Sequence, residues 1–311
     1  MVVIGFDTSN YTTSVAYFNG NSGINCSKLL PVKEGALGLR QSDAVFSHTQ
    51  SLPELSGRLF SNFENNEIAA IGVSTQPRAV EGSYMPCFTV GYSHAKLLSD
   101  AFNVPLFTCS HQQGHVAACL WSAGRLDLMD CKHLAWHLSG GTTELLLVEP
   151  AGKNVNCTRI GGTTDISAGQ LIDRTGQLLG VQFPAGKQID AMSKEAVDRE
   201  VFSVKCPQME FSLSGVQNKV SEYYKKTDNP SETAAYALRC VAKAVCTATD
   251  NARKLYPDLP IVFSGGVASN SLLREATRRF DPIFCEPQFS TDNAMGVAVL
   301  AYRAMEEQYG K

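Results

Sequence analysis

Short apolar runs separated by glycine-rich or polar turns predict buried strands along much of the chain. Each run is five to seven residues long, and this length suits a strand better than a helix. Such runs occur at 2–6, 14–18, 68–74, 134–138, 144–148 and 260–264. We expect the runs at 68–74 and 260–264 to end at the edge of a ligand cleft.

Longer segments with an apolar residue at every third or fourth position predict helices. These segments are about 89–102, 111–122, 165–180, 212–225, 230–255, 269–279 and 292–308. Asp292 stands at the start of the last segment, where a carboxylate can cap a helix. Strands and helices that alternate in this way predict an α/β fold.

The strand, polar turn and strand at the start of the chain recur once further along. In the first copy, residues 2–6 lead through the turn 9–13 into residues 14–18. At a constant offset of 130 residues, three turn residues of the two copies are identical, namely Ser9, Thr12 and Thr13 against Ser139, Thr142 and Thr143. Duplication of one supersecondary unit is the simplest explanation.

A duplicated hairpin whose turn can contact phosphate is typical of actin, the heat-shock ATPases and the sugar kinases, and this chain resembles that architecture. In that fold a nucleotide lies in a cleft between two related domains. A chain of 311 residues also exceeds the usual size of one compact core. We therefore expect two actin-like domains: 1–110, with the C-terminal helix 293–311 packing back on it, and 111–292, with the metal and nucleotide loops.

Composition narrows the possible classes of function. The chain has 27 basic and 30 acidic residues, so a nucleic-acid substrate would need a local basic patch or a partner. Ten cysteines occur without a C-x-x-C spacing, which fits reduced thiols better than a zinc ribbon or a disulfide scaffold. No apolar stretch reaches the roughly 18 residues of a membrane span, and the first residues resemble a strand rather than a signal peptide. We expect a soluble, cytoplasmic protein with no membrane partner.

His111 and His115 are four residues apart in a predicted helix, so both imidazoles lie on one face and can chelate one metal ion. Asp292 is the third candidate ligand, and this trio would leave coordination positions open. The competing interpretation is that histidines at this spacing are surface or hydrogen-bonded core groups. A zinc-protease site would need glutamate directly after the first histidine, and Gln112 stands there instead.

Two glycine-rich segments are candidates for binding phosphate through backbone N–H groups. One is the turn 139–143, and the other, 264–270, follows an apolar strand and opens a helix. Asp173 lies on a predicted helix, and the loop 183–190 ends in a carboxylate, Asp190, that could bind hydroxyl groups. A tight hairpin, a plain strand-to-helix connection and an ordinary loop are the competing interpretations.

In their order along the chain, these segments resemble the universal tRNA threonylcarbamoyladenosine synthase family, historically labelled O-sialoglycoprotein endopeptidase. The similarity runs from residue 2 to about residue 303. The motifs that carry it are 4–9, His48 before Leu52 and Pro53, 110–115, 138–143, 165–173, 183–186 with 189–190, 211–215, 264–270 and 291–293. So many motifs in one order exceed what chance similarity produces.

The resemblance implies transfer of a threonylcarbamoyl group from its adenylate to N6 of the adenosine beside the tRNA anticodon, with release of AMP. It implies one divalent metal ion, iron or zinc, on His111, His115 and Asp292. The adenylate or ATP-type ligand would be held by loop and helix residues, namely His137, Leu138, Ser139, Gly140, Gly141, Asp173, Gly186, Asp190, Gly265, Gly266 and Asn270. The implied partners are tRNA and other proteins of the threonylcarbamoyladenosine pathway.

The sequence departs from the family pattern near the expected chemistry, which indicates a divergent paralogue. Tyr11 and Thr12 replace an acidic pair in the first loop, and Thr142 replaces a histidine. The segment 76–86 replaces a shorter Gly-Pro-Gly loop. It carries three side chains that could build a different pocket, namely Arg78, Glu81 and Tyr84.

The catalytic residues are not identified by these patterns, and Asp7 and Thr12 at the first loop are the candidates. A catalytically silent nucleotide-binding paralogue or partner of a true synthase is one alternative. Loss of the acidic pair favours it, whereas retention of all three metal ligands opposes it. An ATPase is a second alternative, because Asp7 and both glycine-rich loops suit phosphate chemistry. A protease has least support, since no glutamate base or nucleophile–base pair is found.

Overall fold

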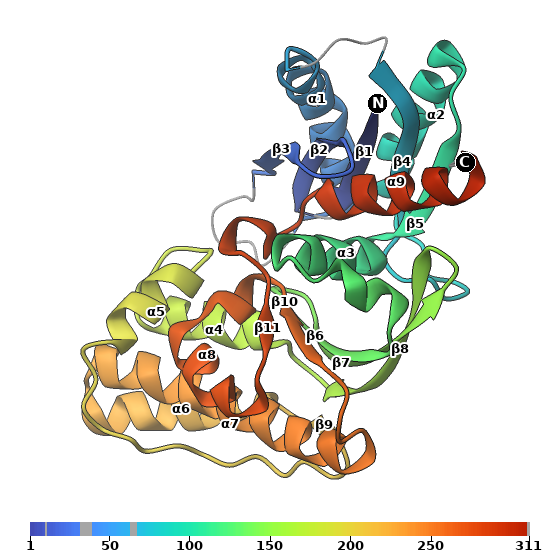
Figure 1. Ribbon diagram of the computed structural model, residues 1–311. Coiled ribbons are helices and arrows are strands. Elements are labelled where there is room, and N and C mark those ends of the chain that lie inside the picture. Colours follow the sequence, from blue (N-terminus) through green and yellow to red (C-terminus); the bar gives the residue numbers. More distant parts are fainter. Residues whose placement is uncertain (10, 32–38, 63–66, 310–311) are drawn as a thin grey trace. The chain divides into compact units, whose positions relative to one another are not determined.

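The computed structural model describes residues 1–9, 11–31, 39–62 and 67–309. Asn10, inside the predicted first turn, and residues 310–311, at the end of the predicted last helix, lie outside these ranges. Contacts divide the chain, drawn in Figure 1, into two compact units. The first unit comprises Met1–Cys131, Glu149–Cys157 and Asp292–Lys311, and the second comprises Lys132–Val148 and Thr158–Thr291.

The first unit contains a five-stranded sheet in the order β3-β2-β1-β4-β5. Its strands are β1 (Val2–Ser9), β2 (Thr12–Phe18), β3 (Gly23–Leu29), β4 (Ile68–Gln76) and β5 (Leu106–Ser110). Its helices are α1 (Gln41–Phe60), α2 (Phe88–Phe102), α3 (His111–Ser122) and α9 (Met295–Tyr309). Alternate residues of β1 face opposite ways: Ile4 belongs to the core that α1 and α2 cover, whereas Val3 packs with Ala301 of α9.

The second unit contains a sheet in the order β11-β10-β6-β7-β8-β9. Its strands are β6 (His133–Leu138), β7 (Thr143–Ala151), β8 (Asn154–Thr163), β9 (Glu210–Phe211), β10 (Ile261–Ser264) and β11 (Ile283–Phe284). Its α-helices are α4 (Ala168–Leu178), α5 (Gly186–Ser193), α6 (Ser214–Thr227), α7 (Pro230–Leu255) and α8 (Ser271–Thr277). The long helix α7 is buried along much of its length and supplies a large share of this unit's core.

The two sheets repeat one topology, which confirms the predicted duplication and the α/β class. The order β8-β7-β6-β10-β11 matches β3-β2-β1-β4-β5 strand for strand. In both sheets the first hairpin is antiparallel, and the next two pairings are parallel. Two hydrophobic sheets of this length also need helices to cover them, which explains the alternating pattern of the sequence.

Three local features differ from the predictions. Helix α5 occupies part of the segment 183–190, which was expected to be a loop. Helix α4 begins at Ala168 rather than at residue 165, and Asp165 instead accepts hydrogen bonds at the start of α6, including one of 2.8 Å from the N–H of Leu213. Helix α9 begins at Met295, and its first N–H is bound by the side chain of Asn293, so Asp292 is not the cap.

Helix α9 lies against its neighbours at three glycines. A Cβ at Gly296 would overlap the carbonyl oxygen of Gly114 in α3. A Cβ at Gly5 of β1 would come within 2.6 Å of the carbonyl oxygen of Ala294, and one at Gly72 of β4 within 2.7 Å of Ala301. Only hydrogen fits at these positions, so backbone approaches backbone directly.

This packing also assigns α3 to a unit. The predicted division began a second domain at residue 111, whereas the compact units place α3 in the first one, together with α9 and the end of the β7–β8 hairpin. The side chain of Gln113 in α3 donates a 2.6 Å hydrogen bond to the carbonyl oxygen of Val155 in that hairpin. Contacts far apart in the sequence therefore determine where α3 packs.

Replacing Gly296 with alanine should separate α3 from α9. The added methyl group has no space against Gly114, so we expect the free energy of unfolding to fall by about 1–3 kcal/mol. Gly57→Ala in α1 is the matched control, because nothing lies within 4 Å of its added Cβ, and it should stabilise by about 0.5–1 kcal/mol. Urea unfolding of both variants measures the difference. Equal stability of the two would contradict the close packing of these helices.

Candidate functional site

The candidate site of the first unit is built around the two histidines of α3. Ser110 ends β5 and caps α3, since its side chain accepts a hydrogen bond from the N–H of Gln113. The side chain of Gln113 accepts one from the N–H of Ser110 in return, at 2.8 Å. This reciprocal capping box fixes the first turn of the helix, where His111 is the first residue, and His115 follows one turn later.

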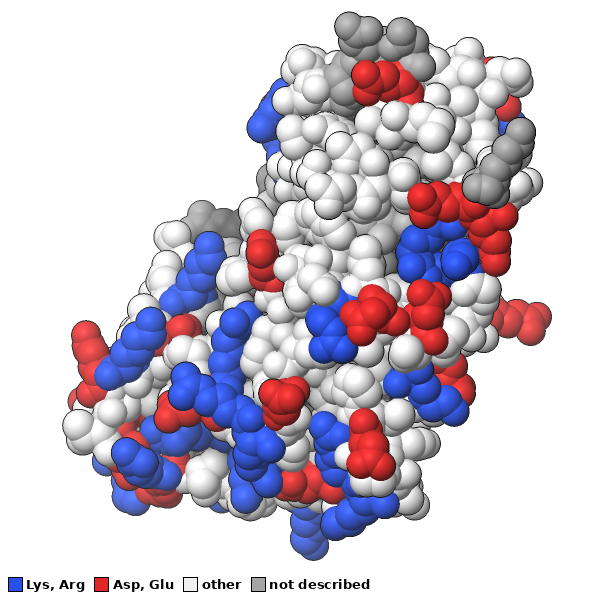
Figure 2. Space-filling model, in the orientation of Figure 1, with Lys and Arg blue, Asp and Glu red and all other residues white. Residues whose placement is uncertain are grey.

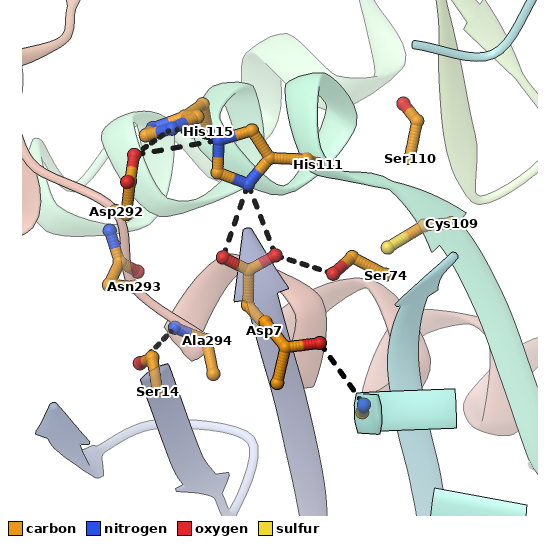
Figure 3. A network of polar contacts seen from close by, with 12 residues as sticks. Asp7, Ser14, Ser74, Cys109, Ser110, His111, His115, Asp292, Asn293 and Ala294 are labelled. Atoms are coloured by element: carbon orange, nitrogen blue, oxygen red, sulfur yellow. Dashed lines mark hydrogen bonds and ion pairs between the residues drawn. The ribbon is translucent and has the colours of Figure 1, made fainter. Parts of the chain in front are cut away.

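Asp292 reaches the histidines because the chain around it is held on the sheet of the first unit. The N–H of Ala294 donates to the hydroxyl of Ser14 at 2.8 Å and to the side chain of Asn25 at 3.0 Å. Figure 3 shows Asp292 on the segment leading to Ala294, with its carboxylate turned toward both imidazoles.

The three donor atoms have the spacing of ligands on one metal ion. The Nε2 atoms of His111 and His115 are 2.9 Å apart, and Oδ1 of Asp292 lies 3.5 and 3.3 Å from them, respectively. Two ligands that are each about 2.1 Å from a metal are about 3.0–3.4 Å apart at angles of 90–109°. Three ligands on one side leave the other positions open, as in the two-histidine, one-carboxylate sites of iron. The donor set therefore fits a divalent metal ion.

The carboxylate of Asp7 contacts the Nδ1 atom of His111. This carboxylate is fully buried at the end of β1 and lies 3.1 and 3.2 Å from Nδ1 of His111. Ser74 of β4 donates a short hydrogen bond to the same carboxylate (Figure 3). An Nδ1–H that points at Asp7 leaves Nε2 of His111 to bind a metal. Asp7, a candidate catalytic residue in the sequence, is thus placed to orient a ligand.

Charge stabilises this arrangement when no metal is bound. Burial alone would lower the pKa of His111, but Asp7 and Asp292 raise it to about 10. Burial would raise the pKa of Asp7, yet the charge and hydrogen bond of His111 lower it. His111 and His115 likewise hold the pKa of Asp292 well below its usual range, against the effect of burial. Two carboxylates therefore flank the His111 imidazole, Asp7 at Nδ1 and Asp292 at Nε2.

Thr12, the other catalytic candidate, lies buried at the start of β2, opposite Ser9 in the strand register. Its neighbour Thr13 bonds Nδ1 of the buried His48 at 2.8 Å. A catalytic role for Thr12 stays a prediction.

The candidate site of the second unit is a cavity of about 730 Å³, which is large enough for a nucleotide. Its lining mixes glycines, two carboxylates, one lysine and small polar side chains. The lining residues are Gly140, Gly169, Ile172, Asp173, Pro184, Gly186, Lys187, Asp190, Gly266, Val267, Ser269, Asn270, Pro287, Gln288, Ser290 and Thr291. All of them belong to the second unit.

The turn between β6 and β7 is hydrogen-bonded to the start of α4 and has open space beside Gly140. Ser167 donates a 2.6 Å hydrogen bond to the carbonyl oxygen of Gly140, and the N–H of Ala168 donates to the hydroxyl of Thr143. A Cβ at Gly169 would meet the carbonyl oxygen of Ser139 at 2.6 Å, so only glycine allows this close contact between α4 and the turn. Nothing lies within 4 Å of a Cβ at Gly140, which leaves room beside its backbone.

Two carboxylates of the cavity are partly engaged with the protein. Oδ1 of Asp190 accepts from the side chain of Asn270 at 2.6 Å and from the N–H and hydroxyl of Ser271 at 2.8 Å. Oδ1 of Asp173 accepts from the N–H of Ala185 at 2.9 Å, and burial raises the pKa of Asp173. Oδ2 of Asp190 forms a long ion pair of 4.0 Å with Nζ of Lys194. The second oxygen of each carboxylate has lone pairs that suit hydroxyl or amino groups of a ligand.

The structure brings together six of the eleven predicted nucleotide residues in this lining, namely Gly140, Asp173, Gly186, Asp190, Gly266 and Asn270. Five others stand outside it, namely His137, Leu138, Ser139, Gly141 and Gly265. Gly265 has φ +89°, and a Cβ there would overlap the carbonyl oxygen of Leu138, so these two residues join β6 to the glycine-rich loop. Contact of any of the eleven with a nucleotide stays a prediction.

The sequence patterns did not indicate several residues of the two candidate sites. The apolar walls Ile172 and Val267 resemble ordinary core positions, and Pro287 lies in a segment without a motif. Ser74 lies in the run 68–74 that was expected to end at a ligand cleft, but no sequence signal indicated its contact with Asp7. Its role becomes visible only where β4 pairs with β1.

Asp7→Asn tests whether Asp7 orients a metal ligand. The amide keeps the shape of the side chain but removes the negative charge facing His111, so we expect metal affinity to fall about 10- to 100-fold. Asp100→Asn, at an exposed carboxylate paired with Lys96, is the control and should bind metal like the wild type. Competition with a chromophoric chelator measures both affinities. Unchanged affinity in Asp7→Asn would contradict the assigned orientation.

Comparison with known protein families gives one match over most of the chain. The model of TsaD, tRNA N6-adenosine threonylcarbamoyltransferase, matches residues 38–299. A threonylcarbamoyltransferase of Carboxydothermus hydrogenoformans is 29% identical over 97% of this chain and 91% of its own length. One from Kosmotoga olearia is 34% identical over 74% of this chain and 70% of its own.

Solved structures confirm the predicted actin-like ATPase fold. Full-length HypF, in a phosphate- and nucleotide-bound form, aligns with the whole chain at a TM-score of 0.64 and 14% identity. The chain spans about half, 47%, of the length of HypF. A glucokinase of the ROK family from Streptomyces griseus aligns with 97% of the chain at a TM-score of 0.55 and 11% identity. Identities this low show the fold alone.

Proposed function

The chain belongs to the tRNA N6-adenosine threonylcarbamoyltransferase family, and from this premise we propose that it transfers a threonylcarbamoyl group from an adenylate to N6 of adenosine in tRNA. In this reaction N6 forms a bond to the carbamoyl carbon and loses a proton, while the bond from that carbon to the phosphate oxygen breaks and AMP leaves. The observation that carries the proposal is the trio His111, His115 and Asp292, whose donor atoms lie within 4.8 Å of one another.

We propose one divalent ion, iron or zinc, as the resident metal of this trio. When bound, such an ion acts as a Lewis acid on a carbamoyl or phosphate oxygen. The protein's own part is to hold the ligands still before the reaction. Asp7, bound at Nδ1 of His111, would leave Nε2 of that ring for the ion, and Ser74 holds the carboxylate of Asp7 in place. A preorganised site of this kind avoids reorganisation while charge develops.

The second-unit cavity is the proposed binding place of the adenylate. The second carboxylate oxygens of Asp173 and of Asp190, the latter in a long ion pair with Lys194, suit hydroxyl groups of a ribose. The open backbone at Gly140 and Gly266 suits phosphate oxygens. Lys187 supplies the one cationic side chain of the described lining. Ile172 and Val267 add apolar surface for a base.

We propose tRNA as the acceptor, with partner subunits of the threonylcarbamoyladenosine pathway assisting. A polyanionic acceptor requires cations on the protein surface. Figure 2 shows Lys and Arg side chains over the helices of the second unit, with acidic side chains interspersed. Basic residues also end two helices of this unit, Lys225 and Lys226 in the last turn of α6 and Arg253 and Lys254 in that of α7. Because basic and acidic side chains are mixed on this surface, we expect the protein alone to bind tRNA with modest affinity. Partner subunits would then contribute to tRNA binding.

A cytoplasmic location belongs to the same proposal. All ten cysteines are free thiols, which fits a reducing compartment such as the cytoplasm. Among the residues that the structure describes, no helix combines the length and the hydropathy that crossing a bilayer requires.

A reconstituted transfer reaction tests the function. Tagged protein, isolated with the subunits that accompany it and loaded with metal, is given threonylcarbamoyl-adenylate and unmodified tRNA. We expect N6-threonylcarbamoyladenosine and AMP in equal amounts by mass spectrometry of the digested RNA. His115→Ala should lower the rate at least about 100-fold by removing a metal ligand, and Asp190→Ala should act mainly on the concentration of adenylate needed.

Asp100→Asn is again the control, with expected wild-type activity, because this carboxylate lies on the surface. Tight binding of the adenylate without any transfer, in wild type and variants alike, would refute the transferase proposal and favour a silent nucleotide-binding paralogue.

A further inference from the structure

The segment 77–86, called here the acceptor loop, is attached at both ends beside the first turn of α3. At its start, the carbonyl oxygen of Pro77 accepts a 3.0 Å hydrogen bond from the N–H of Gln112. Directly after its end, the carbonyl oxygen of the buried Cys87 accepts a 2.9 Å bond from the hydroxyl of Thr8. The ring of Phe88 then lies edge-on to His111, with 6.2 Å between ring centroids. Both ends of the loop thus adjoin the proposed metal ligands.

The middle of the acceptor loop closes on itself. The N–H of Arg78 donates to the hydroxyl of Ser83 at 3.0 Å, and the N–H of Ser83 donates to the carbonyl oxygen of Val80 at 3.2 Å. Gly82 takes φ +76°, which other residues rarely adopt, so the tight turn depends on this glycine. Bonds of this kind hold the exposed residues in one arrangement rather than as an open strand.

The closed turn leaves an aromatic ring exposed to solvent, on a loop whose two ends lie beside the first turn of α3. Tyr84 is 67% exposed and Val80 is 53% exposed. Arg78 and Glu81 are exposed as well. An exposed tyrosine ring offers a flat apolar face, and such faces are used to stack unpaired bases of RNA. Arginine adds an anchor for a phosphate group.

We propose that the acceptor loop binds single-stranded RNA beside the metal centre, with the ring of Tyr84 stacked on an unpaired base and Arg78 on a neighbouring phosphate. This inference rests on the proposed function and names the part of the chain that selects the acceptor. Glu81 cancels the charge of Arg78 within the loop, so the loop does not attract a duplex by charge alone. Without a net charge on the loop, stacking of the Tyr84 ring on an unpaired base is the main interaction that the loop can offer to RNA.

A binding cycle tests the stacking contact. The ligands are an anticodon stem-loop RNA and the same RNA with an abasic site at the adenosine beside the anticodon. We expect Tyr84→Ala to weaken binding of the intact RNA at least about 5-fold and to have no further effect on the abasic RNA. Tyr84→Phe keeps the ring and should bind like the wild type. Tyr92→Ala, at an exposed tyrosine of α2, is the matched control and should also leave binding unchanged.

Arg78→Gln should reduce the slope of log affinity against log salt by about one unit. Metal content and AMP affinity of all variants should equal those of the wild type, because Tyr84 contacts neither proposed site. An effect of Tyr84→Ala that equals that of Tyr92→Ala, or that is the same on both RNAs, would overturn the stacking proposal. Loss of a copurifying protein subunit with unchanged RNA binding would overturn it too, in favour of a protein interface.

The transfer reaction separates this inference from the function on which it rests. If the wild type modifies tRNA and Tyr84→Ala binds RNA equally well, the function stands and the acceptor loop has another role. If the wild type neither binds nor modifies tRNA, both proposals fail.

Discussion

The contact of α9 with α3 at Gly296 and Gly114 is the constraint on which the candidate metal centre depends. The two histidines lie about one third of the way along the chain, whereas Asp292 is close to its C-terminal end. They meet because the two helices approach with only hydrogen atoms between them, while Ser14 and Asn25 fix the chain just before α9. A larger residue at this crossing would move the third ligand, not merely loosen the core.

Contacts between residues far apart in the sequence also link the sheet of the first unit to the candidate metal site. The strands of the first unit are paired so that Asp7 and Ser74 lie side by side at the ends of β1 and β4, behind His111. Burying this carboxylate would be costly by itself, but the imidazole next to it lowers its pKa and keeps it charged. A folded first unit therefore holds the three donor atoms in one arrangement, as the proposed metal site requires.

The sequence predicted much of the fold and part of both candidate sites. The repeated hairpin at a constant offset correctly indicated two sheets of one topology, and the spacing of His111 and His115 placed both on one face of α3. Helix α5 was missed because its short apolar pattern follows proline and glycine. The roles of Asp7 and Gly169 were out of reach, because each depends on a contact with a residue distant in the sequence.

X-ray absorption spectroscopy of the metal-loaded protein tests the central claim most directly, which is that α3 and the segment just before α9 together build one metal site. The account predicts nitrogen and oxygen ligands at about 2.0–2.2 Å, with the scattering of two imidazoles in the wild type and of one in His115→Ala. Sulfur at about 2.3 Å, or a spectrum without imidazole that is the same in the variant, would contradict it.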